Sequence, residues 1–353
     1  MKILVLMKRF GAGKDMVMQD FGRQIRLFGN IAKKHNVDFF VPDYKKLERK
    51  DIRLHGMNFC IRPYSLLRHF SFISELKKSI KKNKYDVIVG TADPLLGILA
   101  YKLGRKYGIK SVYDMQDEYS VYSSYRIPFV QFLDKKSVIG SDVVLTVSDS
   151  LNRLVRQSRK KKTVTIQNGV DANAYKKYSK SAARKKLGLP NKKIIVYVGE
   201  ISRFKGVDIL VESFKEVQKL VPDSCLLLSG PVVDVDIKSR NVIYEKYPEK
   251  WQVIAALSAS DIAVLPNPKN RFSEYCFPYK LAEYMASGIS IVATNMGDAG
   301  LLLKESSLCE PGDKFAMAAK IVENLVHPTN NDYRGILKSL SWKSLSAKVE
   351  SSL

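Results

Sequence analysis

The segment from residue 277 to residue 294, FPYKLAEYMASGISIVAT, combines a helix start with a charged pair. Pro278 suits the first helical turn, where no backbone N–H is needed, and Gly288 suits a C-terminal cap. The apolar, β-branched residues that follow are typical of a buried parallel strand. A helix that begins at the edge of such a sheet is a usual site for an anion. Lys280 and Glu283 can then offer a cation and a carboxylate to that ligand.

A second segment, YVGEISRFKGVDILVESF at residues 197–214, also places charge at a strand end. Gly199 turns the chain after a short apolar run, and a helical pattern begins after Gly206. Arg203 and Lys205 fall in the loop between them. Two cations at this position can bind a diphosphate and stabilise its charge as it leaves. A solvated turn is the alternative.

These segments resemble the C-terminal signature of the retaining family-4 glycosyltransferases, which have the GT-B fold. The family motif is Glu-x7-Glu followed by A-M-A-x-G-x-P-V-V-A-T, and Glu283 matches its second Glu. The first Glu falls at Tyr275, so Glu274 is the nearest carboxylate. Some members carry F-P-x-K-L-x-E-Y instead, and Phe277, Pro278, Lys280, Leu281, Glu283 and Tyr284 match that version.

The resemblance implies a role for each matched residue. Lys205 with Gly206 matches the phosphate-binding loop, in which the family Arg follows the first Gly. Glu200 occupies that position here, so Arg203 is expected to replace the Arg. Glu283 is expected to accept the ribose hydroxyls. The sugar is expected to contact Glu274, Lys280 and backbone groups near Phe277.

Two weaker matches agree in order along the chain. QNGVDANAY at 167–175 and VLTVSDSLNRLV at 144–155 resemble segments that close the first domain of the family. The resemblance therefore implies an α/β, GT-B fold, with two Rossmann-like doubly wound parallel-sheet domains facing a cleft.

The alternation of short apolar runs with helical patterns independently favours such sheets. The rhythm restarts after a polar stretch near residues 171–193, and 353 residues suit two domains. We expect an acceptor-binding domain at 1–175, a nucleotide-sugar-binding domain at 176–335, and a final helix within 336–353. Whether that helix returns to the first domain is left open.

Charge is unevenly distributed along the chain. The net charge is +24, and residues 1–175 hold 33 Lys and Arg against 16 Asp and Glu, a net +17. Such a field attracts polyanions, including anionic lipid headgroups, although solubility alone is an alternative explanation. Nucleic acid is disfavoured because no binding motif accompanies the charge. The four scattered cysteines favour a reducing cytosol.

The glycine loop after the first predicted strand, RFGAGKDMVMQ, fails the Walker A pattern because Lys8 replaces a Gly and Asp15 follows Lys14. In a GT-B enzyme Gly13 would line the cleft near donor phosphate and acceptor; an ordinary turn is the alternative. Asp117, in YDMQDEYSVY, either positions the acceptor hydroxyl, as the resemblance implies, or caps a helix.

Three further patterns leave alternatives open. Asp234 and Asp236 form an Asp-x-Asp that could bind a metal, but the position matches a variable loop and no metal is expected. The histidines show no ligand spacing. Residues 60–84 read as a helix that starts at Pro63; its apolar stripe could lie on an anionic membrane or face the core.

We therefore expect a sugar-nucleotide-dependent, retaining hexosyltransferase of polysaccharide or glycoconjugate biosynthesis. Its donor is a nucleotide-diphosphate sugar, its acceptor a glycan or lipid-linked molecule, and it requires no other cofactor. It is expected in the cytoplasm, with docking on the inner face of the cell membrane as one possibility. A non-hydrolysing sugar-nucleotide epimerase and a catalytically silent sugar-nucleotide-binding protein remain as alternatives.

Overall fold

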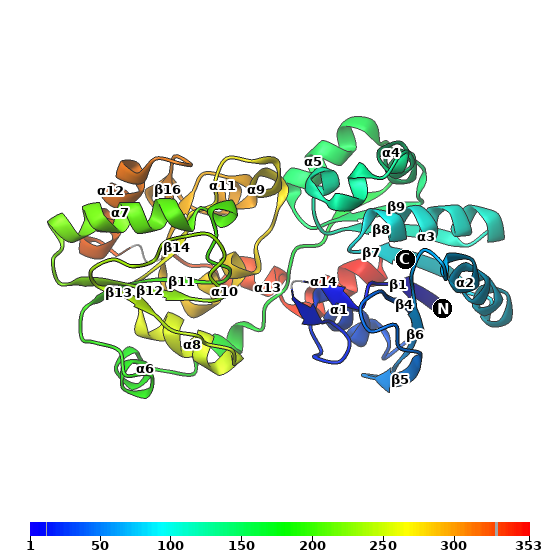
Figure 1. Cartoon of the computed structure of the whole chain (residues 1–353), viewed down its shortest axis with the longest axis horizontal. Coiled ribbons are helices and arrows are strands. Elements are labelled where there is room, and N and C mark those ends of the chain that lie inside the picture. The colour runs from blue at the N-terminus through cyan, green and yellow to red at the C-terminus, as the bar shows by residue number, and fades with distance from the viewer. Residues whose placement is uncertain (12, 329–330) are drawn as a thin grey trace. The chain divides into compact units, whose positions relative to one another are not determined.

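The computed structural model describes residues 1–11, 13–328 and 331–353, which form two compact units (Figure 1). The N-terminal unit contains Met1–Gln167 together with Trp342–Leu353, and the C-terminal unit contains Asn168–Ser341. Each unit is built around one largely parallel sheet with helices on both faces, so the expected α/β architecture is confirmed.

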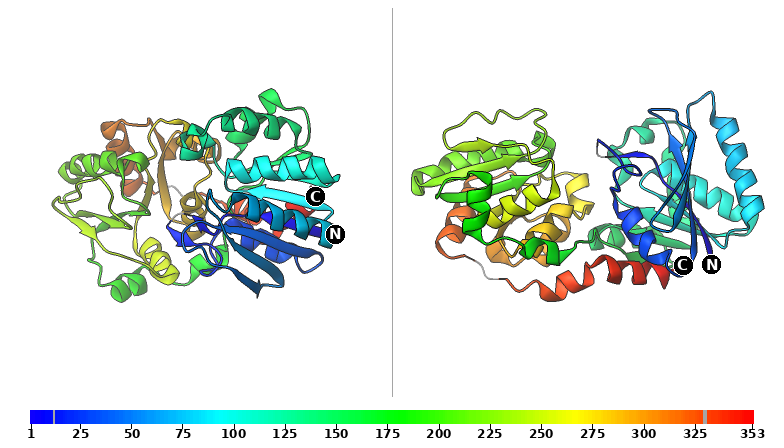
Figure 2. Two further views of the ribbon diagram at one scale, coloured as in Figure 1. Left: turned by 45° about the vertical axis from the view of Figure 1, so that its right-hand side comes forward. Right: turned by 90° about the horizontal axis from the view of Figure 1, so that it is seen from below.

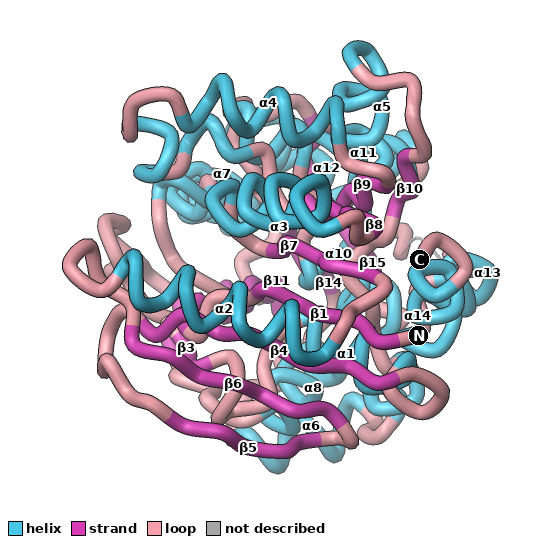
Figure 3. The backbone as a smooth tube through the Cα atoms, turned by 90° about the vertical axis from the view of Figure 1, so that its right-hand side faces the viewer, coloured by secondary structure: helices cyan, strands magenta, loops and turns pink. Residues whose placement is uncertain are grey.

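The N-terminal sheet has eight strands in the order β10-β9-β8-β7-β1-β4-β6-β5. Figure 3 shows the run from β5 through β1 to β8. All neighbours are parallel except β5, which is antiparallel to β6. The strands are β1 (Lys2–Leu6), β4 (Asn36–Asp43), β5 (Lys50–Leu54), β6 (Met57–Pro63), β7 (Val87–Thr91), β8 (Lys110–Met115), β9 (Val143–Thr146) and β10 (Thr163–Thr165), with a separate pair β2 (Phe10–Gly11) and β3 (Lys14–Asp15).

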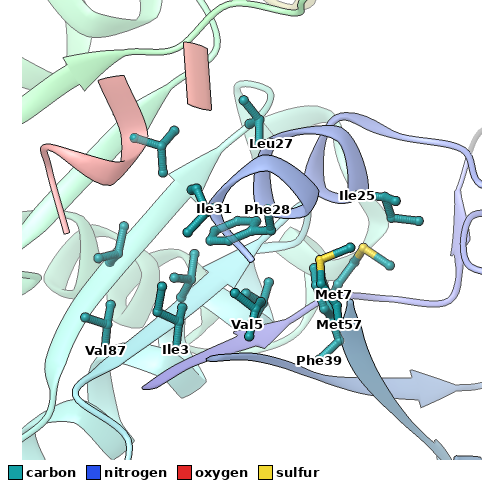
Figure 4. Close-up of a cluster of buried hydrophobic side chains, with 14 of the residues drawn as sticks. Ile3, Val5, Met7, Ile25, Leu27, Phe28, Ile31, Phe39, Met57 and Val87 are labelled. Carbon is teal, nitrogen blue, oxygen red and sulfur yellow. The ribbon is translucent and has the colours of Figure 1, made fainter. Parts of the chain in front are cut away.

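Successive side chains of these strands point to opposite faces of the sheet and so form two apolar layers. On one face, Ile3, Val5 and Phe39 pack against Phe28 and Ile31 of α1, as Figure 4 shows. The final helix α14 packs beside α1 on this face, and α2 and α3 cover the other, as the turned views of Figure 2 also show. The helices of this unit are α1 (Arg23–Ile31), α2 (His69–Asn83), α3 (Pro94–Tyr107), α4 (Val130–Gly140), α5 (Asp149–Ser158) and α14 (Trp342–Glu350), with η1 (Tyr119–Val121) and η2 (Ser123–Arg126).

The expected helix start at Pro63 is wrong. Residues up to Pro63 belong to β6, which forms a hairpin with β5, and α2 begins only at His69. The apolar stripe of α2, formed by Phe72, Leu76 and Ile80, is buried against the sheet. The core alternative is therefore confirmed for Leu76 and Ile80, because a parallel sheet must be covered on both faces. It is wrong for Leu66, Leu67 and Phe70 at the start of the expected stripe, which are exposed.

The C-terminal sheet has six parallel strands in the order β13-β12-β11-β14-β15-β16. This is the strand order of the Rossmann fold. In Figure 1, α7 lies above these strands and α8 below them. The strands are β11 (Lys193–Val198), β12 (Ser224–Ser229), β13 (Val242–Tyr244), β14 (Ile262–Leu265), β15 (Ser290–Thr294) and β16 (Leu308–Cys309).

The order reverses between β11 and β14, because β12 continues on one side of β11 and β15 on the far side of β14. Ligands of such sheets bind outside the carboxyl ends of the strands at this switch point. The helices of the unit are α6 (Lys180–Leu187), α7 (Val207–Leu220), α8 (Lys250–Ala259), α9 (Arg271–Tyr275), α10 (Tyr279–Ser287), α11 (Gly297–Leu302), α12 (Lys314–Val326) and α13 (Arg334–Ser339), with η3 (Ala172–Lys176), η4 (Arg203–Lys205) and η5 (Glu305–Ser307).

Candidate active site

Two glycines let the loops pack closely over the ends of β11 and β12. Gly199 follows β11 with φ 138°, and a Cβ there would lie 2.5 Å from Lys280 Nζ. Gly230 follows β12, and a Cβ there would lie 2.0 Å from the carbonyl oxygen of Gly199. No larger residue fits without displacing a neighbour, so both positions depend on glycine.

Lys280, in the first turn of α10, reaches under this loop. Its Nζ donates a hydrogen bond to the Tyr197 hydroxyl at 2.6 Å and lies 4.0 Å from the centre of that ring. The same hydroxyl donates to the carbonyl oxygen of Glu200 at 2.8 Å. Burial and the nearby charge of Lys205 lower the pKa of Lys280 to about 7, against a smaller opposing effect of Glu283. An anion at this position would restore the charge of the ammonium group.

Lys205 ends the short helix η4 in the loop between β11 and α7. Its Nζ lies 4.2 Å from the ring centre of Phe272 and 4.9 Å from that of Phe204. Gly206, with φ 73°, follows, and a Cβ there would lie 1.9 Å from the carbonyl oxygen of Pro266, beyond β14. The loop is thus held against the end of the neighbouring strand, on the β14 side of the switch point.

Arg203 is exposed and is held by a different loop. Its backbone N–H donates to Asp234 Oδ1 at 2.8 Å, and its Nε donates to the Asp234 carbonyl oxygen at 3.3 Å. The other acidic residue of the Asp-x-Asp, Asp236, accepts from the backbone N–H of Lys238 at 2.9 Å. The pattern that suggested a metal therefore serves here to fasten two loops.

The start of α10 is fixed from the segment that precedes η3. Phe277 is buried, and its carbonyl oxygen accepts a hydrogen bond from Asn168 Nδ2 at 2.7 Å. Pro278 is the residue before the first helical turn. The QNGVD segment thus orients the helix whose N-terminus faces the carboxyl edge of the sheet.

Glu283 lies one turn after Lys280 and is partly buried. Its Oε1 accepts a hydrogen bond from the Tyr175 hydroxyl at 2.7 Å. Burial raises the pKa of Glu283, and the Tyr175 bond and the charge of Lys250 oppose this shift. Tyr175 is a contact that the sequence analysis missed, although it stands in the same QNGVDANAY segment.

Glu274 is exposed on the five-residue helix α9, which follows β14. Asn270 caps that helix by accepting from the backbone N–H of Ser273 at 2.8 Å. Gly297, the first residue of α11 after β15, packs so closely that a Cβ would lie 2.6 Å from the Ser273 carbonyl oxygen. Glu274 therefore comes from the same edge of the sheet as Lys205.

In the N-terminal unit, Gly13 and Asp117 both follow parallel strands, β1 and β8. Gly13 has φ 74° and an open position for a Cβ. Asp117 accepts a hydrogen bond from the Tyr122 hydroxyl at 2.5 Å, while Glu118 caps η1. The N-cap of η1 is thus the neighbouring carboxylate, Glu118, whose side chain accepts from the backbone N–H of Ser120.

The sequence analysis also missed a buried polar cluster at this edge. Arg23 Nη2 pairs with Asp114 Oδ1 at 3.1 Å, and Asp114 Oδ2 accepts from Thr91 at 2.7 Å and from Gln116 at 2.9 Å. Within the described residues, Arg23 Nε and Nη1 are buried and have no protein partner. Asp114 belongs to the same YDMQDEYSVY segment as Asp117, but no spacing pointed to Arg23.

Comparison with known families gives two matches, one in each unit. Residues 192–327 match the family model described as glycosyl transferases group 1, and residues 27–174 match that described as glycosyltransferase family 4. Together the matches cover most of the chain.

Curated relatives agree with this assignment. The chain is 25% identical over 284 residues to YtcC of Bacillus subtilis (strain 168), whose name assigns it to the glycosyltransferases; the match covers 74% of this chain and 66% of YtcC. It is 24% identical over 218 residues to D-inositol 3-phosphate glycosyltransferase of Rhodococcus jostii (strain RHA1), covering 56% of this chain and 47% of that protein. The chain thus spans between about half and two thirds of the length of these relatives.

Solved structures share the fold. Sucrose-phosphate synthase from Thermosynechococcus elongatus has a TM-score of 0.75 at 18% identity, covering 99% of this chain and 97% of its own. HepE from Anabaena, solved with UDP and glucose, has a TM-score of 0.74 at 17% identity over the full length of both chains. Family models matched in both units, together with the GT-B fold, support a resemblance of this chain to the family-4 glycosyltransferases.

Proposed function

We propose that this protein transfers a hexose from a nucleotide-diphosphate sugar to a hydroxyl group of its acceptor, with retention of anomeric configuration. The observation that carries the proposal is the pairing of Lys205 and Lys280 at the switch point of the C-terminal sheet, close enough for one charge to lower the pKa of the other. Among the described residues, Lys205 Nζ and Lys280 Nζ contact aromatic rings and the Tyr197 hydroxyl, with no carboxylate ion-paired to either, and two such neighbouring cations suit a diphosphate. The relative HepE was solved with UDP and with UDP-glucose.

Each residue of the site takes a role consistent with its place. Lys205 and Arg203 bind the phosphates, and Gly199 lets the diphosphate approach the backbone. Glu283 accepts the ribose hydroxyls. Glu274, Lys280 and the backbone around Phe277 and Pro278 contact the sugar, and Lys280, which neighbours Lys205, also contacts the diphosphate.

The proposed reaction breaks the bond between the sugar C1 and the diphosphate oxygen and forms a bond from C1 to the acceptor oxygen on the same face. The acceptor proton passes to the leaving diphosphate, which serves as the base. Lys205 stabilises the charge that develops on the diphosphate, so the proposal requires no metal or other cofactor. Asp117 and Gly13 belong to the acceptor side.

The acceptor is proposed to be a glycan or a lipid-linked molecule, reached by peripheral binding to the cytoplasmic face of the cell membrane. The support is the net charge of +17 on residues 1–175. Among the described residues, no helix has the length and apolar character needed to span a bilayer.

An epimerase would require a histidine and carboxylates around the sugar. Among the described residues of the C-terminal unit, the one histidine is His327, which follows α12 at the opposite edge of the sheet from Lys205. The unit that holds the two lysines thus offers no histidine beside them, which favours transfer over epimerisation.

The test is incubation with labelled sugar nucleotides and a membrane lipid extract. Transfer of label to lipid or glycan, with the anomeric configuration of the product read by NMR, supports the proposal. Conversion of the sugar nucleotide itself would show an epimerase, and binding without turnover would show a silent binding protein.

A further inference from the structure

Two neighbouring loops of the N-terminal unit leave the sheet side by side. β4 and β6 are parallel neighbours in which Asp43 pairs with Pro63, and the Tyr64 N–H donates to the Asp43 carbonyl oxygen at 2.9 Å. The loops that follow therefore start together at the carboxyl edge of the sheet. We define the edge patch as the exposed apolar and basic residues of these loops and of the first turn of α2: Tyr44, Lys45, Lys46, Leu47, Leu66, Leu67, Arg68 and Phe70.

The apolar side chains of the edge patch are among the most exposed in the molecule. Leu66, Leu67 and Phe70 are 90%, 98% and 85% exposed. Within two residues of Phe70, α2 turns its apolar stripe into the core, and Phe72 is only 4% exposed. Figure 3 shows this loop at the left-hand end of α2. Exposed apolar side chains clustered in this way indicate a surface that binds an apolar partner.

The same patch is positively charged. Lys45, Lys46 and Arg68 are exposed, and within the described residues no acidic side chain pairs with them. The nearest carboxylates in sequence, Asp43 and Glu48, both bind Arg9, at 2.8 and 2.7 Å. Lys45 Nζ lies 5.2 Å from the ring centre of Phe10. Exposed apolar side chains together with cations that have no acidic partner complement an anionic bilayer, because the headgroups attract the cations and the acyl boundary accepts the apolar groups.

A second exposed apolar segment lies along the same edge. Phe129 and Phe132, 78% and 66% exposed, follow β8 and open α4. In the sheet order, β8 and β6 are separated by four strand spacings, so the chain leaves the sheet toward the two segments at points about 19 Å apart. A second apolar segment reached from a separate strand could fix the orientation of the unit as well as add contact.

We propose that the edge patch inserts into the headgroup region of an anionic bilayer, so that the carboxyl ends of β4 and β6 lie at the membrane surface. Asp117 and Gly13 follow strands at this same edge, so a lipid-linked acceptor would be presented beside them. Only the presentation of a lipid-linked acceptor rests on the proposed function. Membrane insertion itself can be measured without sugar transfer.

The test is flotation of the full chain with vesicles of phosphatidylglycerol and phosphatidylcholine, against vesicles of phosphatidylcholine alone. We expect binding to the anionic vesicles and reduced binding as salt is raised. A Phe70→Trp variant should show a blue shift in fluorescence on the anionic vesicles and be quenched by brominated acyl chains.

Two pairs of variants test whether vesicle binding depends on the edge patch itself or only on the total exposed apolar surface and total charge of the protein. Leu66→Ser/Leu67→Ser/Phe70→Ser should weaken binding by at least about tenfold, because each inserted side chain contributes a transfer free energy. The matched control, Leu220→Ser/Phe315→Ser/Val326→Ser, removes three exposed apolar groups of the C-terminal unit and should bind as wild type. Lys45→Gln/Lys46→Gln/Arg68→Gln should also weaken binding.

The matched charge control is Lys78→Gln/Lys81→Gln/Lys82→Gln, which lies toward the other end of α2; Lys81 is about 16 Å from Phe70 along the helix. Equal losses from the two charge variants would overturn the proposal in favour of diffuse attraction. Wild-type binding by the triple-Ser variant, or absence of binding by the wild-type protein at low salt, would also overturn it. So would self-association, measured by analytical ultracentrifugation, that the triple-Ser change abolishes.

A transfer assay distinguishes failure of the membrane proposal from failure of the proposed function. Vesicle binding without any turnover of sugar nucleotides would contradict the proposed function and leave the membrane surface standing. Turnover with a soluble acceptor, without vesicle binding, would support the proposed function and contradict the membrane surface.

Discussion

Lys280 Nζ lies 2.6 Å from the Tyr197 hydroxyl, and a Cβ on Gly199 would lie only 2.5 Å from this nitrogen. The three residues come from the first turn of α10, from β11 and from the loop after β11. An ammonium group held at a strand end in this way is lined up with the position at which Rossmann sheets bind phosphates. Its lowered pKa follows from burial and from Lys205.

The first prediction concerns pH. Since the pKa of free-protein Lys280 is about 7, rather than 10.5, the residue is protonated below that pH and loses its proton above it. A diphosphate favours the protonated form, so affinity for a nucleoside diphosphate should fall as pH rises above 7, with proton uptake on binding. Isothermal titration calorimetry in buffers of different ionisation enthalpy measures both.

Lys280→Met is the control for that titration. It should bind more weakly at pH 6 and lose the pH dependence around 7. A wild-type pH profile in this variant would assign the titration to another group.

Gly199→Ala tests the close approach of the loop. The left-handed φ of 138° and the 2.5 Å contact with Lys280 Nζ both oppose a Cβ. We expect a loss of about 1–3 kcal/mol in unfolding free energy together with weaker diphosphate binding. Gly188→Ala, with φ 65° and an open Cβ position, is the matched control: thermal denaturation should show a loss of stability, but diphosphate affinity should be unchanged.

Lys205→Ala should nearly abolish transfer without unfolding the protein. One charge-assisted phosphate contact is worth about 1.5–3 kcal/mol, and more if it strengthens in the transition state. Arg203→Ala should behave similarly if Arg203 replaces the family Arg. Its bonds to Asp234 make the comparison informative, because near-wild-type kcat/KM for Arg203→Ala would show that it serves only to fasten the loop.

Glu283→Gln should weaken binding of the free nucleoside diphosphate as well as of the donor, because an amide is a poorer acceptor for two ribose hydroxyls. Tyr175→Phe removes the hydrogen bond at 2.7 Å but keeps the carboxylate, so its effect should be smaller. Affinities from calorimetry decide the point. Unchanged affinity in Glu283→Gln would remove Glu283 from the ribose site.

Glu274→Ala should lower turnover of the sugar donor while hardly changing affinity for the bare diphosphate. The reason is that Glu274 is assigned to the sugar and lies exposed on α9, so its removal costs the fold little. Steady-state kinetics and calorimetry on the same preparation measure the two effects. A parallel loss of both would indicate a structural role.

The sequence alone determined the alternation of strands and helices, because buried parallel strands such as 143–146 and 290–294 are continuous apolar runs bounded by turns. It also determined the residue types at the strand ends, since Gly, Lys and Glu at fixed offsets are local features. The motif around Glu283 and the loop with Lys205 were visible for this reason.

The tertiary structure decided which residues meet. Tyr197 and Lys280 are 83 positions apart, and Tyr175 and Glu283 are 108 apart, so no local spacing reports either pair. The same holds for Arg23 with Asp114. Strand order brings such residues to one sheet edge, and strand order depends on long-range pairing.

The residues around Pro63 show where a local sequence pattern gave the wrong prediction. The sequence from 60 to 84 has a helical apolar period, yet its first residues pair with β5 and only Phe72, Leu76 and Ile80 enter the core. Periodicity identifies apolar side chains but cannot tell which of them the sheet will cover. Phe72, Leu76 and Ile80 are buried and Leu66 is 90% exposed because of the position at which β6 ends. Tertiary packing determines that position.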